Sequence, residues 1–440
     1  MRFTFLLLLI VYLFQSTTLF GQQFTDIWKQ IGDATCAFPN DVFFPSPDTG
    51  YVVASDNHIR KTNDGGKNWL FFTELRDTLK IKYNIYDLKS VHFTTNDSGI
   101  IVGYQWNTEF SNGNLSGIIL KTNDGGRNWK ITADLPYLRE IQMVNNNIGY
   151  IAGEVILKTE DGGKTWKQVF KQPKVVFNAI HFFDEETGYI AGTACTIYQT
   201  KDGGQNWTLL LNSDKIGYDY QLDEIVFADT NKGYALATSG IRFCIQTKDG
   251  GKTWKRHLID SIRHDWSVMY FVDERIGFAS GKMSILGGDT TFAYTTNGGD
   301  TWKFYEDKFR WAGSKGQASF HFPTKNIGYC IGTLISAIGK TTNGGVPVSR
   351  DTKLNNNYTV WISPNPNQGN FIMNLNTNEV GNLKIEIFEI TGRLIYTNNI
   401  LLDDPKVREI PIKLKEIDSG IYSLKVSLGN QTQLVRLIIE

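Results

Sequence analysis

Carboxylate side chains recur at one fixed position of a short phrase along this 440-residue chain. The phrase reads Thr-x-Asp-Gly-Gly-x-(Asn/Thr)-Trp, and its first copy runs from Thr62 to Trp69. Carboxylates can act as general acids or bases. Here, however, each can accept backbone N–H bonds from the residues that follow it, and Gly-Gly supplies the positive φ of a tight turn. We therefore expect a structural role for the six side chains at this position, which are Asp64, Asp124, Asp161, Asp202, Asp249 and Asn297.

Three other acidic residues are the candidates for catalysis. Asp87, Asp223 and Asp265 each precede an apolar strand-like run and follow a long polar stretch. Glycoside hydrolysis needs two carboxylates, or a Tyr with a Glu, at a set separation. The alternative, solvated loop carboxylates, is far commoner. The chain has no Gly-x-Ser-x-Gly, His-Glu-x-x-His or Walker-type phosphate loop, so other common hydrolytic sites and nucleotide binding have no motif here.

Aromatic side chains near charged residues form a candidate binding site. They fall in long stretches outside the repeated phrases, where loops are free to vary. Aromatic rings with polar tips suit carbohydrate stacking or protein recognition. The alternative is that they pack the loops onto the body of the fold. The candidates for ligand binding are Trp106, Trp266, Trp311, Tyr104, Tyr220 and Arg310.

Two repeated phrases predict the elements that position these residues. Each Asp phrase follows a strand-like run, a polar turn and a second phrase that starts with Gly and an aromatic or aliphatic residue, such as Gly149-Tyr150. One unit therefore reads as four strands. The copies start at 62 and end with a seventh at 341, a mean repeat of about 46 residues, which is typical of a propeller blade. The sequence predicts an all-β protein with a seven-bladed propeller, the candidate site residues lying on the face opposite the Asp phrases.

The seventh copy, residues 341–345, lacks its Trp and is followed by Pro347, which is a poor occupant of a central strand. The stretch Trp28-Lys29-Gln30 matches the residues that follow the other copies, as in Trp166-Lys167-Gln168, but has no Asp phrase before it. We expect this N-terminal strand to complete the seventh blade. The alternative is an unrelated N-terminal arm.

The Asp phrase resembles the Asp-box of sialidases, sortilin-type receptors and photosystem II stability/assembly factor-like propellers. The whole pattern is most similar to the last of these, which implies a propeller that serves as a binding scaffold. Asp-box sialidases and xyloglucan-type glucanases imply the enzyme alternative. The chain lacks the Phe/Tyr-Arg-Ile-Pro phrase and the spaced Arg triad of sialidases, which argues against that activity.

The last 80 or so residues lose the repeat and alternate strands with Gly and Pro turns, which predicts a small β-sandwich. They resemble the type A C-terminal sorting domain of type IX secretion, except that the chain ends in Glu440 where a basic residue is usual. The resemblance implies export through the type IX translocon as a partner, and it argues against a photosynthetic role. The residues that carry it are Pro364, Asn365, Pro366, Gly392, Gly420 and Tyr422.

The N-terminal segment has the features of a signal peptide. Met1-Arg2 is followed by a mainly apolar run, residues 3–14, which is too short to span a bilayer. We expect a signal peptide over 1–21, the propeller over 22–349, a linker over 350–358 and the sorting domain over 359–440. No transmembrane segment is expected in the mature protein, which would be secreted or attached to the outer-membrane surface.

Composition limits which classes of partner are expected. Lys plus Arg equals Asp plus Glu at 45 each, which argues against nucleic acid. The four Cys have no Cys-x-x-Cys spacing, so no metal or cofactor is expected. The sequence leaves the disulfide pairing of these four residues open. The function predicted is that of a secreted or surface-attached scaffold that binds a glycan or a protein. The alternative is a secreted glycoside hydrolase that uses loop-face carboxylates on a polysaccharide.

Overall fold

The computed structural model divides the chain into two compact units, a propeller within residues 23–346 and a β-sandwich after residue 346. Residues 1–26, with the expected signal peptide, lie outside the described part, and so do the linker residues 350–357 and Cys36. No helix in the described part is long and apolar enough to cross a membrane. The described residues are 27–33, 38–72, 75, 86–106, 115–237, 244–257, 264–283, 290–305, 318–332, 337–346, 358–363, 365, 367–377, 379–389, 393–404, 407–415, 417–429 and 431–439.

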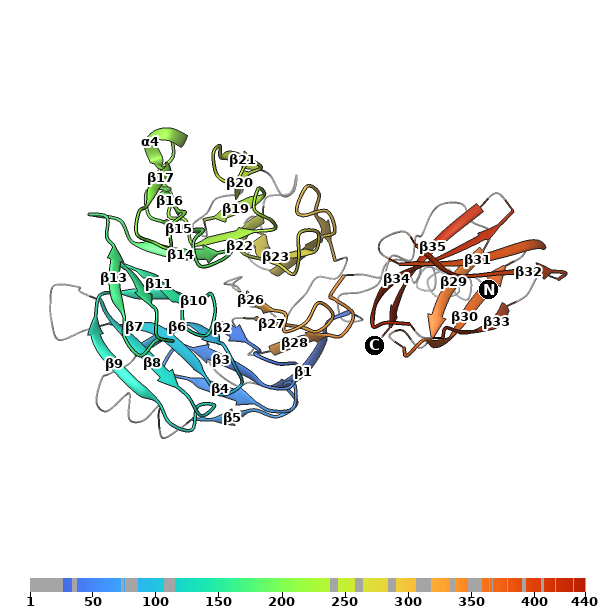
Figure 1. Ribbon diagram of the computed structural model, residues 1–440, viewed down its shortest axis with the longest axis horizontal. Helices are drawn as coiled ribbons and strands as arrows, with labels where there is room; N and C mark the ends of the chain where they lie inside the picture. Colours follow the sequence, from blue (N-terminus) through green and yellow to red (C-terminus); the bar gives the residue numbers. More distant parts are fainter. Residues whose placement is uncertain are drawn as a thin grey trace, which may run out of the picture. The chain divides into compact units, whose positions relative to one another are not determined.

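Seven four-stranded antiparallel sheets form the propeller (Figure 1), which confirms the predicted seven blades. Within each blade the strands pair in chain order, except in the last, where the N-terminal strand takes the outer edge. The helix α4 (Ser213–Ile216) follows the fourth blade. In chain order, the blades are β2 (Pro39–Phe43), β3 (Gly50–Ala54), β4 (Ile59–Thr62) and β5 (Leu70–Phe71); β6 (Tyr86–Phe93), β7 (Gly99–Trp106), β8 (Leu115–Thr122) and β9 (Lys130–Leu135); β10 (Leu138–Met143), β11 (Gly149–Gly153), β12 (Ile156–Thr159) and β13 (Lys167–Phe170); β14 (Phe177–Phe182), β15 (Gly188–Gly192), β16 (Ile197–Thr200) and β17 (Thr208–Leu211); β18 (Glu224–Phe227), β19 (Gly233–Leu236), β20 (Cys244–Thr247) and β21 (Lys255–His257); β22 (His264–Phe271), β23 (Gly277–Met283), β24 (Thr290–Thr295) and β25 (Lys303–Phe304); and β26 (Ala318–His321), β27 (Gly328–Gly332), β28 (Ala337–Thr341) and β1 (Lys29–Asp33).

The Asp boxes are the turns between the third and fourth strands. In the third blade, Asp161 Oδ1 accepts bonds from the N–H groups of Lys164 and Thr165, both at 2.9 Å. Thr159 Oγ1 donates to Asp161 at 2.8 Å and accepts the N–H of Gly163 at 2.8 Å. These local bonds, first among them the one from the Thr165 hydroxyl, hold the pKa of Asp161 below its usual value. The carboxylate is thus fully used by its own turn.

The Gly that begins each Gly-aromatic or Gly-aliphatic phrase has a packing role that was not predicted from the sequence. A Cβ built on Gly188 would lie 2.5 Å from the ring of Phe182, which ends the innermost strand β14 of the same blade. Six of the seven blades place a Phe ring at this distance, and the third uses Met143 against Gly149. The aromatic residue after the Gly also links blades, because Tyr150 and Tyr189 donate to the box carbonyls of Gly203 and Gly250 at 3.0 and 2.9 Å.

The N-terminal strand closes the ring as predicted. β1 pairs antiparallel with β28, with Ile31 opposite Ile338. Trp28 is fully buried and stands edge-on to Phe322 at 5.8 Å. Its ring lies against Gly345, the second Gly of the seventh box, as the ring of Trp166 lies against Gly163.

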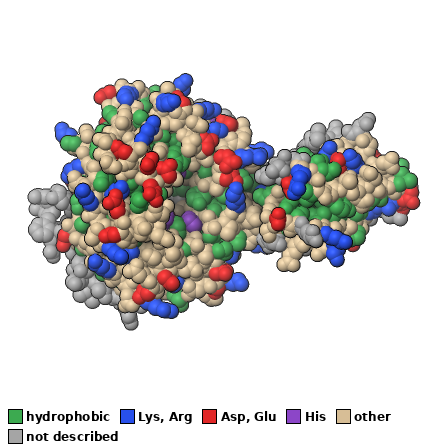
Figure 2. Space-filling view, viewed as in Figure 1, with side chains coloured by type: hydrophobic (Ala, Val, Ile, Leu, Met, Phe, Trp, Pro, Cys, Tyr) green, Lys and Arg blue, Asp and Glu red, His purple; other side chains and the backbone are tan. Residues whose placement is uncertain are grey.

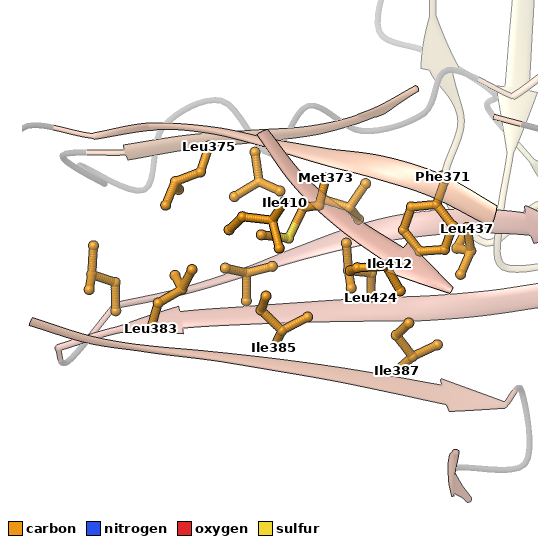
Figure 3. Packing of buried hydrophobic residues seen from close by; sticks show 14 of the residues in the cluster. Phe371, Met373, Leu375, Leu383, Ile385, Ile387, Ile410, Ile412, Leu424 and Leu437 are labelled. Carbon is orange, nitrogen blue, oxygen red and sulfur yellow. The ribbon is translucent and has the colours of Figure 1, made fainter. Parts of the chain in front are cut away.

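The second unit is a sandwich of two sheets, as predicted. One sheet has the strand order β29 (Tyr358–Ser363), β30 (Asn370–Thr377) and β33 (Val407–Lys413); the other has β32 (Leu394–Leu402), β31 (Gly381–Glu389), β34 (Gly420–Leu428) and β35 (Gln431–Ile439). Figure 3 shows the side chains that fill the space between the sheets, among them Met373, Ile385 and Leu424, which are fully buried.

Asn365 ties the start of the sandwich to its last strand. Its Nδ2 donates to the carbonyl of Arg436 at 2.9 Å, and its Oδ1 accepts the N–H of Ile438 at 2.8 Å. Tyr422 in β34, the strand that begins at Gly420, donates to the carbonyl of Asp418 at 2.8 Å. Pro364, Pro366 and Gly392 lie outside the described residues.

Candidate functional site

A cavity of about 480 Å³ lies between the seven innermost strands, and we refer to it as the axial cavity. Its lining residues come from β2, β6, β10, β14, β18, β22 and β26, with Asp223 just before β18. Figure 2 shows histidine side chains inside a hollow near the middle of the propeller. We call the face that carries the Asp boxes the box face, and the opposite face, where innermost strands begin, the loop face.

The lining residues form three tiers along the axis. In each blade, the tier of a residue follows from how many positions it stands before the Phe or Met that packs on the repeated Gly: four for the mouth tier, three for the middle tier and one for the box tier. The mouth tier, nearest the loop face, is Asn40, Lys89, Arg139, Asn178, Asp223 and Ser267. The middle tier is Asp41, Ser90, Glu140, Glu224, Val268 and Ser319. The box tier is Phe43, His92, Gln142, His181, Val226, Tyr270 and His321.

Several of these side chains bond to the backbone of the next blade. Asp41 accepts the N–H of Val91 at 2.9 Å, and Glu140 accepts the N–H of Ile180 at 2.8 Å. Gln142 accepts the N–H of Phe182 at 2.7 Å and donates to its carbonyl at 3.0 Å. Innermost strands of neighbouring blades share no sheet. These bonds therefore supply partners for backbone groups that no strand satisfies.

The predicted residues Asp87 and Tyr104 meet beside the mouth of the cavity. Asp87 accepts bonds from Asn40 and Ser55 at 2.8 Å each and from the Tyr104 hydroxyl at 3.2 Å, and it pairs with Lys89 at 2.6 Å. Burial acts to raise the pKa of Asp87, but the charge and hydrogen bond of Lys89 and the bonds from Ser55 and Asn40 outweigh it and lower the pKa. Asp87 is therefore an ionised carboxylate that accepts bonds from several neighbours, and it lacks the raised pKa of a general acid.

Asp223, also predicted, takes part in a link across the mouth tier. It pairs with Arg139 at 3.0 Å and accepts a bond from Gln221 at 2.7 Å. Arg139 belongs to the third blade and Asp223 to the fifth, so this ion pair passes over the fourth blade. There, Asn178 donates to the carbonyl of Leu222 at 3.0 Å. Fixed charges of both signs thus surround the entrance.

The middle tier holds carboxyl groups that resist ionisation. Burial raises the pKa of Asp41 to about 6, although bonds from Val91 and Ser319 act to lower it. Burial also raises the pKa of Glu140 to about 8, and Asp41 adds to the effect. Glu224 is shifted well above its usual pKa by burial and by the nearby Glu140 and Asp41. Near pH 7, Glu140 therefore favours its protonated form, and the pKa of Glu224 is shifted in the same direction.

The box tier holds three neutral imidazoles. Burial lowers the pKa of His92 and of His181 to about 4, and burial together with His92 lowers that of His321 to about 3. His321 Nδ1 accepts the N–H of Phe44 at 3.2 Å, which joins the seventh blade to the first. The cavity floor is therefore polar and carries no positive charge near neutral pH.

One predicted ligand-binding residue is misplaced by the sequence analysis. Trp266 was expected in an exposed loop but lies within β22, is 2% exposed and packs 6.0 Å from Phe304. A β-bulge between Trp266 and Val268 turns the indole into the blade, at the core position that Leu88 or Leu138 occupies elsewhere. In this structure Trp266 is a core residue.

The other predicted residues are only partly described. Tyr220 lies in the connection between the fourth and fifth blades, where its ring stacks on Tyr218 at 5.7 Å. Trp106 ends β7 opposite Leu115, and Asp265 in β22 pairs with Lys282, but their side chains lie outside the described residues. Arg310 and Trp311 lie outside them entirely.

The cavity lining was not predicted from the sequence. Its signal was available, because polar residues stand one or three positions before the apolar residue that ends each innermost strand, as with Gln142 and Glu140 before Met143. Aligning the seven units on that residue brings the three tiers into register.

Comparisons with known proteins agree with this architecture. The family profile described as Photosynthesis system II assembly factor YCF48 matches residues 21–136, 79–217 and 168–260, which together span more than half of the chain. The profile described as Secretion system C-terminal sorting domain matches residues 361–440. The Photosystem II assembly lipoprotein Ycf48 of Synechococcus sp. (strain CC9902) is 25% identical over 248 residues, which is 56% of this chain and 57% of that protein. The match thus spans little more than half the length of the relative.

Solved structures share the fold. One described as YCF48 bound to D1 peptide has a TM-score of 0.55 at 20% identity and covers 74% of this chain and 99% of its own. The GH74 enzyme of Niastella koreensis has a TM-score of 0.50 at 13% identity and covers 93% of this chain and 67% of its own. At these identities the likeness shows a shared fold and no shared chemistry.

Proposed function

Because the chain belongs to the Photosynthesis system II assembly factor YCF48 family, we propose that its propeller is a scaffold that binds a polypeptide partner at the loop face, around the mouth of the axial cavity. Its C-terminal unit is a type IX sorting domain, which supports a secreted or outer-membrane surface location and engagement with the translocon. The partner is therefore to be sought outside the cell or on its surface, and not in a photosystem.

The observation that carries the proposal is the pre-arranged set of charged groups at the mouth. Asp87, Lys89, Arg139 and Asp223 are held by short bonds yet remain partly exposed, except for Asp223, whose side chain is 6% exposed. Groups that are already ordered lose little conformational freedom when a partner binds. Charges of both signs in fixed positions favour specificity through electrostatic complementarity.

Among the candidate aromatic residues whose side chains the structure describes, the state of Trp266 and Tyr104 favours a polypeptide over a glycan. Sugar stacking needs an exposed ring face. Trp266 is buried, and Tyr104 is engaged with Asp87 and packs 4.7 Å from the ring of Tyr137. The family supports the same choice, since one structure is described as YCF48 bound to a D1 peptide.

The proposal is tested with the exported full-length protein on a peptide array and a glycan array. We expect retention on peptides, lost on Arg139→Ala. Lys171→Ala is the matched control, because Lys171 makes a 2.7 Å ion pair with Glu154 whose two side chains are both nearly half exposed. Retention that survives Arg139→Ala, or binding to glycans alone, would overturn the proposal.

The second candidate is a secreted glycoside hydrolase, and one observation favours it. Glu140 and Glu224 line a shared cavity, burial raises the pKa of Glu140 to about 8, and the pKa of Glu224 is also raised, which is the direction that a general acid needs. Hydrolysis of a polysaccharide by the wild-type protein that is lost in both Glu140→Gln and Glu224→Gln would support this candidate instead.

A further inference from the structure

The strand β32 is an open edge of the sandwich. It is the terminal strand of its sheet and is bonded to β31, and no other described strand pairs with its second side (Figure 1). The strand is nine residues long. Its register with β31 shifts only near Leu394, so the stretch from Tyr396 to Leu402 is regular. A regular edge of this kind presents a row of backbone N–H and C=O groups on which a further strand can form.

The other terminal strands of the sandwich are occupied or protected. On β35, Asn365 bonds to the N–H of Ile438 at 2.8 Å, and the N–H of Asn367 donates to the carbonyl of the same residue at 3.0 Å. On β29, the N–H of Val360 donates to the side chain of Gln433 at 3.1 Å. β33 contains a proline and three charged residues, which discourage strand pairing. β32 is therefore the edge of the sandwich that stays open.

β32 lacks the features that protect an exposed edge. Lysine, other charged residues and proline discourage pairing. None of these occurs in β32, which reads Leu-Ile-Tyr-Thr-Asn-Asn-Ile-Leu-Leu, and Leu401 is 70% exposed. The outermost strands of the propeller differ, because they are two to six residues long and five of the seven begin with Lys. A partner strand thus meets less resistance at β32 than at any of those edges.

The sequence of β32 matches itself when two copies pair antiparallel about Asn398. In that register every polar residue faces a polar residue, and every apolar residue faces an apolar one. The pairs are Asn398 with itself, Thr397 with Asn399, Tyr396 with Ile400, Ile395 with Leu401 and Leu394 with Leu402. No charge is present, so no like charges meet across the two-fold axis.

Other registers match less well. A shift of two residues in one direction puts Thr397 opposite Leu401, and a shift of two in the other direction puts Tyr396 opposite Asn398. A shift of one residue pairs side chains that point to opposite faces of the sheet. The matched register is therefore the one that a second copy would adopt.

We propose that β32 is an interface between two copies of this chain, which pair antiparallel about Asn398 and join their four-stranded sheets across a two-fold axis. Because Asn365 and Asn367 occupy β35, the far edge of the same sheet, the pairing stops at a closed dimer. A single strand pair buries little surface, so the dissociation constant is on the order of micromolar. The interface uses no residue of the mouth, and the inference is independent of the proposed scaffold function.

Two exposed positions allow the register to be tested with charges. Within the sheet, Thr397 faces Glu386 of β31, and Asn399 faces Lys384. Across the proposed axis, Thr397 of each copy faces Asn399 of the other. Thr397→Lys with Asn399→Glu therefore places opposite charges against each other both within the sheet and between the copies. Thr397→Lys with Asn399→Lys instead places like charges opposite each other twice in each dimer.

The experiment is analytical ultracentrifugation of the purified full-length protein over about 1 to 100 µM, a range that brackets micromolar dissociation constants. We expect a dimer in the wild type, which the opposite-charge variant retains. The like-charge variant should weaken association at least about tenfold. Leu401→Glu should also weaken it, because the carboxylate would face Ile395 of the second copy. Leu434→Glu is the matched control, since Leu434 is 50% exposed and lies on β35, at the far edge of the same sheet.

The melting temperatures of the variants separate lost pairing from lost folding. If the like-charge variant melts well below the wild type, Leu401→Glu decides, because that side chain is mostly exposed and its loss leaves the core intact. A wild type that stays monomeric over the whole range, or that forms assemblies larger than a dimer, would overturn the inference. So would a dimer that withstands Leu401→Glu, or one that the two charge variants weaken equally.

Discussion

At the scale of single residues, the propeller uses carboxyl groups in two opposite ways. Those of the Asp boxes are partly exposed and accept several local N–H and O–H bonds, and the pKa of Asp64 falls to about 2, chiefly because of the bond from the Asn68 N–H. Those of the axial cavity are enclosed, and burial raises the pKa of Glu140 to about 8. The first kind favours the ionised form in the folded state, and the second favours the protonated form.

The second kind makes stability depend on pH. The pKa of Glu140 rises from 4.5 to about 8 on folding, so its contribution to stability is complete below about 4.5 and is lost as the pH rises towards 8. Glu140→Gln keeps the acceptor for Ile180 and removes this dependence. We expect its melting temperature to exceed that of the wild type at pH 8 and to match it near pH 4.5, as measured by circular dichroism. If the difference in melting temperature between the two proteins stayed constant from pH 4.5 to pH 8, the raised pKa assigned to Glu140 would be wrong.

At the scale of elements, each blade packs one large side chain against one glycine. The Phe or Met that ends the innermost strand lies over the Gly that begins the second strand, and there is no room for a Cβ between them. In the blades that use Phe, a Trp then contacts the same ring, as Trp207 meets Phe182 edge-on at 6.2 Å. Three residues far apart in each of these repeats are thus packed on one another.

Overpacking at this contact should destabilise a blade. Gly188→Ala places a methyl group about 2.5 Å from the Phe182 ring, so we expect a loss of about 1–3 kcal/mol in the free energy of unfolding, measured with urea. Phe182→Leu in the same background should recover part of the loss, because the ring that causes the clash is gone. Additive effects of the two substitutions would show that they do not share this contact.

The closing strand offers a second test at this scale. Trp28 is 0% exposed and contacts Phe278 and Phe322, whereas Trp166 in the third blade is partly exposed. Trp28→Ala should cost about 3–5 kcal/mol of unfolding free energy, and Trp166→Ala clearly less, because the cavity it leaves is partly open to water. If both substitutions cost the same unfolding free energy in urea, Trp28 would contribute no more to the stability of the ring than the Trp of an ordinary box.

The repeated phrases made most of this fold predictable. Thr159, Asp161 and Gly163 act through contacts a few residues apart, and such contacts leave their spacing in the sequence. The closing role of Trp28 could be inferred because a defective box at 341 lacked its partner. The cavity was missed because Asp41, Glu140 and Glu224 lie far apart in the sequence, on three different blades, and only the closed ring makes them line one cavity. Trp266 was misplaced because a β-bulge decides which way it points, and no short motif marks a bulge.

At the scale of the whole molecule, the chain folds as two separate units. The propeller residues 23–346 and the sandwich after 346 form separate compact units, each with its own core. The sorting domain matches residues 361–440, which fall in the second unit. The propeller and the sorting domain therefore do not share a core.

This division predicts the fate of a truncated chain. A protein that ends after residue 346 should remain in the periplasm, because it lacks the sorting domain, and should melt at a temperature close to that of the propeller transition of the full protein. Cell fractionation and calorimetry measure the two properties. Normal appearance of the truncated chain at the surface or in the medium would show that the C-terminal unit is dispensable for export.

The seventh blade also determines how the propeller carries mechanical load. In the other six blades the chain leaves from the outermost strand, which has a neighbour on one side only. In the seventh it leaves after β28, which is bonded to β27 on one side and to β1 on the other. A pulling force applied through the C-terminal end, whether by a translocon or by a surface tether, therefore reaches a strand held along both edges. Removing β1 would turn that same attachment point into an edge strand that can peel away one bond at a time.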